Sequence, residues 1–299
     1  MGTKIFIDGQ AGTTGLGIAE RLTEAGGFTL VELAGHERKD PEARRRAMGE
    51  AEVTILCLPD DAAREAVALA PAGARLLDAS TAHRTSPGWV YGFAELAPGQ
   101  DAAIAQAARV ANPGCYATGA IALIRPLRAA GLLGATAMLS INAVSGYSGG
   151  GKAMIAAHEQ AGGPAFELYA LGLNHKHLPE IMAYGGLSRA PLFVPSVGHF
   201  AQGMLVSIPL HLEAHATTPA RLAALYADYY GDNGVVIPRG LWAENLTPEA
   251  LNGTNCLEIF IAANEAAGQA VLIARLDNLG KGASGAAVQN LNLMLGRRQ

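Results

Sequence analysis

The chain has 299 residues, more than one hydrophobic core usually organises, so we expect two domains. Half of its residues are hydrophobic, and a net charge of −4 argues against a nucleic-acid partner. Its three cysteines are irregularly spaced, which argues against a disulfide framework and a cysteine-type zinc site. The N-terminus runs into a strand without a signal-peptide pattern, and the apolar runs are too short to span a membrane. We therefore expect a cytoplasmic protein with no membrane partner.

The first element is an apolar strand over 4–8, followed by a glycine-rich turn and a helical pattern over 16–25. A strand, a glycine turn and a helix in this order place backbone N–H groups and a helix N-terminus where they can bind a phosphate. The spacing is GxxGxxG, and an ordinary turn between a strand and a helix would also produce it. The candidate cofactor-binding residues here are Gly9, Gly12, Thr13, Thr14 and Gly15.

The second strand is predicted over 28–34, and its end bears on the choice of cofactor. An NAD enzyme commonly closes this strand with an acid that binds the ribose 2′-hydroxyl. Glu32 is predicted to lie inside the strand, and Arg38 and Lys39 follow it. Cations at this place favour a 2′-phosphate and hence NADP, although a solvated charged loop would explain the same residues.

Further strands over 53–58 and 75–79 alternate with helices, which predicts a doubly wound parallel sheet. Asp60 or Asp61 is expected to cap the helix that runs to residue 70. Ligands in such sheets lie beyond the carboxyl ends of the strands. The turns expected at that edge are 9–15, 59–61, 80–84 and 112–115.

Cys115 follows a Pro-Gly turn and precedes an apolar run over 117–127 that is typical of a helix. A cysteine at a helix N-terminus is favoured as a thiolate by the helix dipole and the unpaired N–H groups. Most free cysteines are small buried residues instead, and Cys57 and Cys256 fit that description. Cys115 is therefore the candidate nucleophile.

Beyond this helix the pattern changes to longer strands with fewer helices, which predicts an α+β second domain. A strand over 136–144 leads into a loop, 145–152, that is rich in glycine and built for close backbone approach. The remaining predicted elements are strands over 192–197, 204–211, 256–262 and 270–277, a helix over 219–229, a glycine-rich turn over 278–285 and a terminal helix.

His175 and His177 stand out among eight histidines because Pro179 predicts the first turn of a helix just after them. In such a turn Glu180 can hydrogen-bond His177 and fix its tautomer. Cysteine, histidine and carboxylate form the general set of an activated nucleophile. A metal bound by the two histidines is the competing interpretation, but the sequence indicates no further ligands, so no metal is expected.

A cysteine nucleophile beside a dinucleotide crevice indicates thioester chemistry coupled to hydride transfer, with a histidine as the acid and base. Backbone N–H groups near Cys115 could stabilise an oxyanion. Arg84 is the best-placed cation for an anionic substrate, although a surface salt bridge is the common role of arginine.

At this point the chain resembles a known family, N-acetyl-γ-glutamyl-phosphate reductase, in its short form. The resemblance covers essentially the whole chain. It is carried by segments 7–15, 78–84, 112–119, 144–152, 175–180 and 277–285, of which Asn112-Pro113-Gly114-Cys115 and His175-Lys176-His177-Leu178-Pro179-Glu180 are the most specific.

The resemblance implies an NADP-dependent acyl-phosphate reductase. Its reaction is the NADPH-dependent reduction of N-acetyl-L-glutamyl 5-phosphate to the 5-semialdehyde, with release of phosphate, in arginine biosynthesis. It implies that Cys115 is the nucleophile and that His177 is the acid and base, held by Glu180. It implies substrate contacts at Arg84, His175, Ser145, Gly146 and Lys152, and a place for Asn278 near the nicotinamide. Lys152 and Gly150 differ from the longer form, which commonly has Arg and Ala there.

The family also implies an architecture. We expect a Rossmann-type NADP-binding domain over 1–114, completed by 278–299, and an α+β catalytic and oligomerisation domain over 115–277. A homodimer or homotetramer is expected through the second domain. The nearest rival is an aspartate-semialdehyde dehydrogenase, whose cysteine usually follows Asn-Pro-Asn, and a rival of another class is a non-catalytic NADP-binding sensor.

Overall fold

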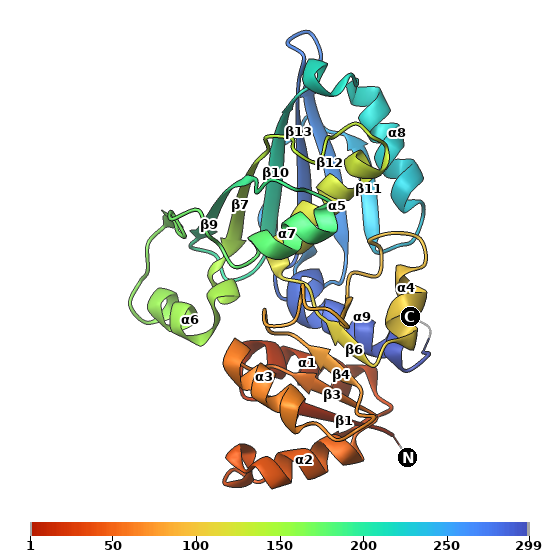
Figure 1. Cartoon of the computed structure of the whole chain (residues 1–299). Helices are drawn as coiled ribbons and strands as arrows, with labels where there is room; N and C mark the ends of the chain where they lie inside the picture. Colours follow the sequence, from red (N-terminus) through yellow and green to blue (C-terminus); the bar gives the residue numbers. More distant parts are fainter. Residues whose placement is uncertain (1, 298–299) are drawn as a thin grey trace. The chain divides into compact units, whose positions relative to one another are not determined.

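The structure is a computed structural model that describes residues 2–297, and the chain divides into two compact units. The first unit runs to Pro113 and includes the segment from Ala283 onward, and the second is Gly114–Gly282. Each unit is built on its own sheet (Figure 1).

The first unit contains a six-stranded parallel sheet of order β2-β1-β3-β4-β6-β5. Its central strands are apolar on both faces, as a parallel sheet covered on both sides requires. Ile5 and Ile55 pack with α1 and α9 on one face, while Phe6 and Leu56 pack with α2 and α3 on the other. The doubly wound prediction is confirmed. The elements are β1 Thr3–Asp8, α1 Thr13–Ala25, β2 Phe28–Val31, η1 Glu37–Lys39, α2 Pro41–Glu50, β3 Val53–Leu56, α3 Asp60–Leu69, β4 Leu76–Asp78, β5 Val90–Tyr91, α4 Gln100–Gln106, β6 Arg109–Ala111 and α9 Gly285–Met294.

Several predicted boundaries in this unit are wrong by a few residues. Strand β2 ends at Val31, so Glu32 follows the strand instead of lying inside it. Strand β3 ends at Leu56, so Cys57 also follows its strand. The predicted aspartate cap of α3 is wrong, because the N-cap is Pro59 and Asp60 Oδ1 instead accepts a hydrogen bond from the Thr81 N–H at 2.9 Å.

Gly9 allows the turn after β1 to pass directly against the end of β3. Its φ is +87°, a conformation that side chains rarely adopt, and a Cβ there would lie 2.3 Å from the Cys57 carbonyl oxygen. The turn between strand and helix therefore requires glycine at this position for the fold itself.

The second unit contains a seven-stranded mixed sheet of order β11-β12-β13-β10-β7-β9-β8. Helices α5 and α8 pack on one face, and Tyr226 and Tyr230 of α8 donate hydrogen bonds to the Leu123 and Ala122 carbonyls of α5 at 2.5 and 2.8 Å. Figure 1 shows α5 and α7 on the same side of the sheet. The elements are α5 Cys115–Ala129, β7 Ser140–Gly146, η2 Tyr147–Gly150, α6 Gly151–Glu159, β8 Phe166–Leu168, α7 Leu178–Gly185, β9 Leu192–Gly198, β10 Met204–His211, η3 Glu213–His215, α8 Pro219–Tyr230, β11 Val236–Leu241, η4 Pro248–Leu251, β12 Leu257–Asn264 and β13 Gln269–Leu276.

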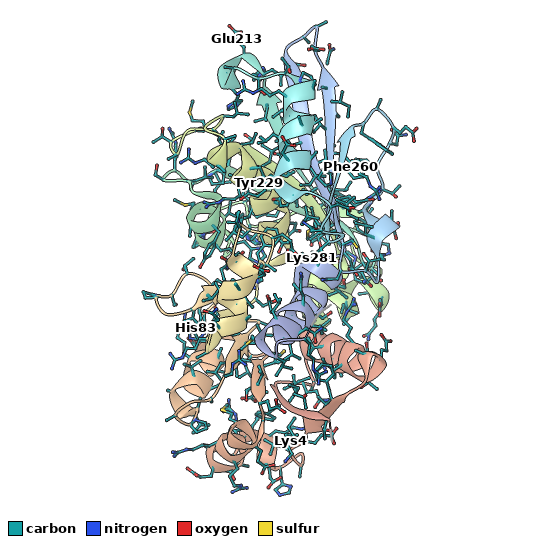
Figure 2. All side chains as sticks on the ribbon, turned by 90° about the vertical axis from the view of Figure 1, so that its right-hand side faces the viewer. Lys4, His83, Glu213, Tyr229, Phe260 and Lys281 are labelled. Atoms are coloured by element: carbon teal, nitrogen blue, oxygen red, sulfur yellow. The ribbon has the colours of Figure 1, made fainter. Side chains whose placement is uncertain are left out.

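The start of β7 and the glycine-rich turn at 278–285 differ from the sequence prediction. Strand β7 begins at Ser140, because a turn between Gly134 and Ala137 precedes it. Residues Gly280–Ser284 form a short π-helix, η5, which leads into α9 and contains the buried Lys281 labelled in Figure 2.

Candidate active site

Cys115 is the first residue of α5, and Gly114 is the N-cap. Cys115 is partly buried, and the first turn of α5 contains no acidic residue. Gly114 closes the turn through its carbonyl, which accepts hydrogen bonds from the Thr118 N–H at 2.9 Å and the Thr118 hydroxyl at 3.1 Å. The predicted position of Cys115 at the start of a helix is confirmed, and at such a position a helix dipole favours a thiolate.

Glu180 links the cysteine helix to the histidine segment. Its carboxylate is 1% exposed, and Oε2 accepts a hydrogen bond from the Gly114 N–H at 3.1 Å. Oε1 lies 4.0 Å from His177 Nε2. His177 is the N-cap of α7, so the first helical turn brings its ring and the carboxylate to the same place. The contact with Gly114 was not expected from the sequence.

His175 and His177 are both buried and lie among aromatic rings. The His177 N–H donates a hydrogen bond to His175 Nδ1 at 3.1 Å, and His175 Nε2 lies 3.3 Å from the Tyr169 hydroxyl. The Tyr116 and Phe193 rings meet the His175 ring edge-on, with centroids 5.8 and 5.0 Å away. This aromatic cluster consists of Tyr116, Tyr169, His175, His177 and Phe193.

The two tyrosines of this cluster are hydrogen-bonding groups and do not ionise near neutral pH. Burial raises the pKa of Tyr169 to about 12 and, with Tyr169 beside it, raises the pKa of Tyr116 as well. The Tyr116 hydroxyl donates to the Ser196 carbonyl at 2.8 Å. Sequence reasoning missed both tyrosines, although Tyr116 follows the candidate nucleophile directly.

The loop that follows β7 is held by the segment 200–203. The N–H groups of Gly146, Tyr147 and Ser148 donate to the carbonyls of Gly203, Phe200 and Ala201 at 2.9, 3.0 and 3.1 Å. A Cβ at Gly146 would lie 2.6 Å from the backbone of Ala201, so glycine is needed here for packing within the unit. The predicted substrate contacts therefore differ in exposure: Ser145 and Gly146 are buried, and Lys152 is exposed on α6.

Asn278 is buried and joins two loops of the same unit. Its Oδ1 accepts from the Gly203 N–H at 2.7 Å, and its Nδ2 donates to the Ser148 hydroxyl at 2.9 Å. The neighbouring Asp277 is also buried and accepts from Gln202 Nε2 at 2.6 Å and the Gly253 N–H at 2.8 Å. Asn278 thus holds the 145–152 loop through the Ser148 hydroxyl.

The glycine-rich turn of the first unit borders a cavity of about 530 Å³. Exposed Arg38 and Lys39 line it, and so does Glu32, which lies directly after β2. Both the cations that favour a 2′-phosphate and an acid that could bind a ribose hydroxyl are therefore present. The lining residues near the turn are Asp8, Gly9, Gln10 and Ala11.

Sequence reasoning also missed the partners of two buried aspartates at the carboxyl ends of strands in the first sheet. Asp8 accepts from Arg44 at 2.7 Å, and burial raises the pKa of Asp8 although Arg44 opposes the shift. Asp78 lies 2.6 Å from His83 Nδ1 (Figure 2 labels His83). Both aspartates end a strand, and that position was the available signal.

Arg84 is buried in the first unit. Its Nε donates to the Asn112 carbonyl at 3.0 Å. The guanidinium is therefore anchored to the segment that leads to Cys115. Because Arg84 is buried, the alternative explanation of an exposed surface salt bridge is wrong.

Two features are absent from residues 2–297. Within that range, no helix is long and apolar enough to cross a membrane. Nor do three His, Cys, Asp or Glu side chains of the described chain come together as possible metal ligands.

Comparison with known proteins places the chain among reductases. Residues 115–278 match the family described as "Semialdehyde dehydrogenase, dimerisation domain". The chain is 53% identical to "N-acetyl-gamma-glutamyl-phosphate reductase 2" of Pseudomonas putida, covering 99% of this chain and 97% of that protein. It is 50% identical to "N-acetyl-gamma-glutamyl-phosphate reductase" of Trichormus variabilis, covering 98% and 97%.

Solved structures of lower identity share the fold. Aspartate semialdehyde dehydrogenase II of Vibrio cholerae, in complex with ASA, superposes with a TM-score of 0.70 at 16% identity, over 99% of both chains. The aspartate semialdehyde dehydrogenase of Candida albicans, solved with NADP, has a TM-score of 0.68 at 12% identity, over 98% of both chains. At these identities the likeness establishes the architecture, a Rossmann-type unit with a second α+β unit.

Proposed function

The chain belongs to the N-acetyl-γ-glutamyl-phosphate reductase family, and we propose that it catalyses the reduction after which its relatives are named. The substrate is N-acetyl-L-glutamyl 5-phosphate, the products are the 5-semialdehyde and phosphate, and the pathway is arginine biosynthesis. The observation that carries this proposal is an identity of 53% that extends over 99% of the chain. The position of Cys115 at the start of α5 agrees with it.

Cys115 performs the first step of the proposed mechanism. Its thiolate attacks the acyl carbon, a C–S bond forms, the bond to the phosphate oxygen breaks, and phosphate leaves. N–H groups of the first turn of α5 stabilise the negative oxygen of the tetrahedral species. NADPH, when bound, supplies the hydride that reduces the thioester.

His177 handles the proton of the second half-reaction. It gives a proton to the oxygen of the hemithioacetal as that species forms, and takes the hydroxyl proton back as the C–S bond breaks. The aldehyde is then released and Cys115 is again a thiolate. Glu180, 4.0 Å from His177 Nε2, orients the ring. Arg84, Ser145, Gly146 and Lys152 are the proposed substrate contacts of this reaction.

NADP is the proposed cofactor of the first unit. The cavity of about 530 Å³ beside the glycine turn is lined by Arg38 and Lys39, whose charges suit a 2′-phosphate. Gly9, Gly12, Thr13, Thr14 and Gly15 would hold the pyrophosphate at the start of α1. Asn278 is the proposed nicotinamide contact. Glu32 lies in the same lining and provides the matched control for replacing Arg38 and Lys39, since Glu32→Gln should increase the preference for NADPH over NADH.

The experiment that tests the function is an assay in the reverse direction. Purified protein is given NADP⁺, phosphate and either N-acetylglutamate 5-semialdehyde or aspartate 4-semialdehyde, and NADPH formation is followed. Two results together support the proposal. Turnover should be greater with N-acetylglutamate 5-semialdehyde than with aspartate 4-semialdehyde, and it should disappear in Cys115→Ser. Preference for the aspartate aldehyde would reassign the enzyme, and NADP⁺ binding without turnover would make it a sensor.

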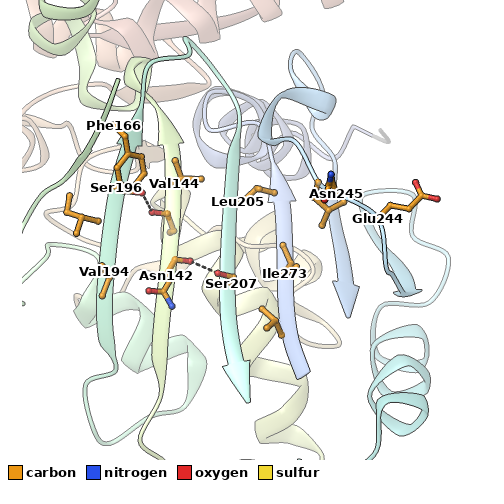
Figure 3. Close-up of a pocket in the computed structure, with 14 residues that line it drawn as sticks. Asn142, Val144, Phe166, Val194, Ser196, Leu205, Ser207, Glu244, Asn245 and Ile273 are labelled. Carbon is orange, nitrogen blue, oxygen red and sulfur yellow. Dashed lines mark hydrogen bonds between the residues drawn. The ribbon is translucent and has the colours of Figure 1, made fainter. Parts of the chain in front are cut away.

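We propose a homodimer formed through the outer face of the second sheet, the face opposite α5 and α8. The matched family is named for a dimerisation domain. Figure 3 shows Val144, Val194, Leu205 and Ile273 on this face, around a hollow of about 560 Å³. Leu205→Glu should shift sedimentation toward a monomer, while Leu241→Glu, exposed on β11, serves as the control. A wild-type monomer would contradict the dimer, and a larger species would favour the tetramer.

The domain boundaries and the cellular location stay proposals. We assign NADP binding to 1–114 with 278–299 and catalysis with oligomerisation to 115–277, near the division of the chain after Pro113 and Gly282. A cytoplasmic location is likewise a proposal, carried over from the sequence expectation, and fractionation of cells that express the protein tests it.

A further inference from the structure

His175 lies in the second unit with both ring nitrogens facing groups of the chain. Nδ1 accepts the His177 N–H at 3.1 Å, so this nitrogen carries no proton. In the neutral ring the proton is then on Nε2, which lies 3.3 Å from the Tyr169 hydroxyl. The ring is 8% exposed, so little of it faces solvent.

The partner of His175 Nδ1 is the backbone of the proposed acid and base. His177 is the N-cap of α7, with φ −87° and ψ −9°, and the direction of its side chain depends on where this backbone unit is held. The hydrogen bond from its N–H fixes the entry to the helix. Displacing His177 would also change its distance from Glu180.

The other side of His175 is anchored as well. The Tyr169 hydroxyl lies 3.3 Å from His175 Nε2, and the Tyr116 hydroxyl nearby donates to the Ser196 carbonyl at 2.8 Å. Neither phenol ionises near neutral pH, since burial raises the pKa of Tyr169 to about 12 and that of Tyr116 still further. On this side His175 thus faces a phenol that stays neutral.

From this arrangement we infer that His175 is a positioning residue that holds the His177 backbone, in place of the substrate contact that the family resemblance implies. The inference rests on the proposed function, because it assigns a role around the proposed acid and base. Loss of the hydrogen bond from the His177 N–H to His175 Nδ1 should lower the catalytic rate and leave substrate affinity nearly unchanged.

The test uses two amides that mimic different ring nitrogens. In His175→Asn the side-chain oxygen is bonded to Cγ, as Nδ1 is, and can accept the His177 N–H. In His175→Gln the amide reaches the place of Nε2 and leaves the His177 N–H without this acceptor. Lys176→Ala is the matched control, since Lys176 is exposed between the two histidines.

Steady-state kinetics and backbone amide exchange are measured on the full chain. We expect His175→Gln to lower kcat about tenfold with KM changed less than about twofold, and to speed exchange of the His177 amide about tenfold. His175→Asn should keep kcat within about threefold of wild type and keep the amide protected. Lys176→Ala should change neither quantity.

A raised KM with unchanged kcat in both variants would overturn the inference and restore the substrate contact. Equal loss of kcat in Asn and Gln would overturn it too, because the Nδ1 acceptor would then be irrelevant. If His175→Gln does not fold, a raised KM in His175→Asn with a protected His177 amide still contradicts the positioning role of His175. Amide exchange needs no substrate, so an inactive wild type would reject the proposed function and leave this inference testable.

Discussion

Replacing Glu180 by glutamine separates two roles that its carboxylate performs. The side chain is 1% exposed, accepts the Gly114 N–H at 3.1 Å and lies 4.0 Å from His177 Nε2. Glutamine keeps an oxygen that can accept the Gly114 N–H, but it removes the negative charge beside His177. Alanine removes both and leaves a buried N–H.

The expected magnitudes follow from these contacts. A hydrogen bond to a charged group contributes about 1.5–3 kcal/mol and a neutral one about 0.5–1.5 kcal/mol, so Glu180→Gln should cost about 1 kcal/mol of unfolding free energy. Glu180→Ala should cost about 3 kcal/mol, because the Gly114 N–H is left buried and a cavity forms. A loss of about 1.4 kcal/mol in orienting His177 lowers kcat about tenfold in the glutamine variant.

Three measurements on the glutamine variant check this reasoning: urea unfolding, kcat, and the rate at which iodoacetamide alkylates Cys115. Removing a negative charge beside the N-terminus of α5 favours a thiolate, so alkylation should be no slower than in wild type while kcat falls. Unchanged kcat would refute the orienting role. Alkylation that slowed in parallel with kcat would show instead that Glu180 acts on the cysteine.

Three further predictions concern the nucleophile, the cofactor and the response to pH. Cys115→Ala should abolish turnover while NADPH still binds, and a thiol reagent should label Cys115 faster than Cys57 or Cys256; equal labelling of all three with activity intact would contradict the nucleophile. Replacing Arg38 and Lys39 together by serine should lower the preference for NADPH over NADH at least about tenfold, measured as a ratio of kcat/KM values. The reason is that a charge-assisted contact contributes about 1.5–3 kcal/mol. A wild type that uses both cofactors equally would contradict the selection of a 2′-phosphate by these two cations. Burial, with Asp78 and Asp8 nearby, raises the pKa of Cys57 from 9.0 to about 12, so the unfolded chain loses this proton first and stability should fall as pH rises from 9 toward 12. Urea unfolding of wild type and Cys57→Ala at pH 8 and pH 10.5 isolates this effect, and an equal loss of stability in both proteins would exclude it.

The sequence alone determined the features that depend on local pattern. Alternating apolar runs and glycine turns predicted the parallel sheet, because side chains of a strand buried on both faces must all be apolar. A Pro-Gly pair before an apolar run predicted Cys115 at the start of a helix, and Pro179 predicted a helical turn that brings Glu180 near His177. The motifs also carried the family resemblance, which the relatives confirm.

Strand ends were less well determined, and the errors had chemical consequences. Glu32 was predicted inside its strand, but β2 ends one residue earlier and leaves this acid in the lining of the cavity beside the glycine-rich turn. The pattern of apolar residues continues past the last ladder hydrogen bond, so hydrophobicity alone does not mark where a strand stops.

Tertiary structure alone decided which polar groups meet. Gly114 and Glu180 are 66 residues apart, Ser148 and Asn278 are 130 apart, and no periodicity in the chain pairs them. Gly146 resembled a ligand-binding glycine, yet its missing side chain is required by the backbone of Ala201. Hydrogen bonds act over about 3 Å, so their partners are set only when the packing of distant segments brings donor and acceptor together.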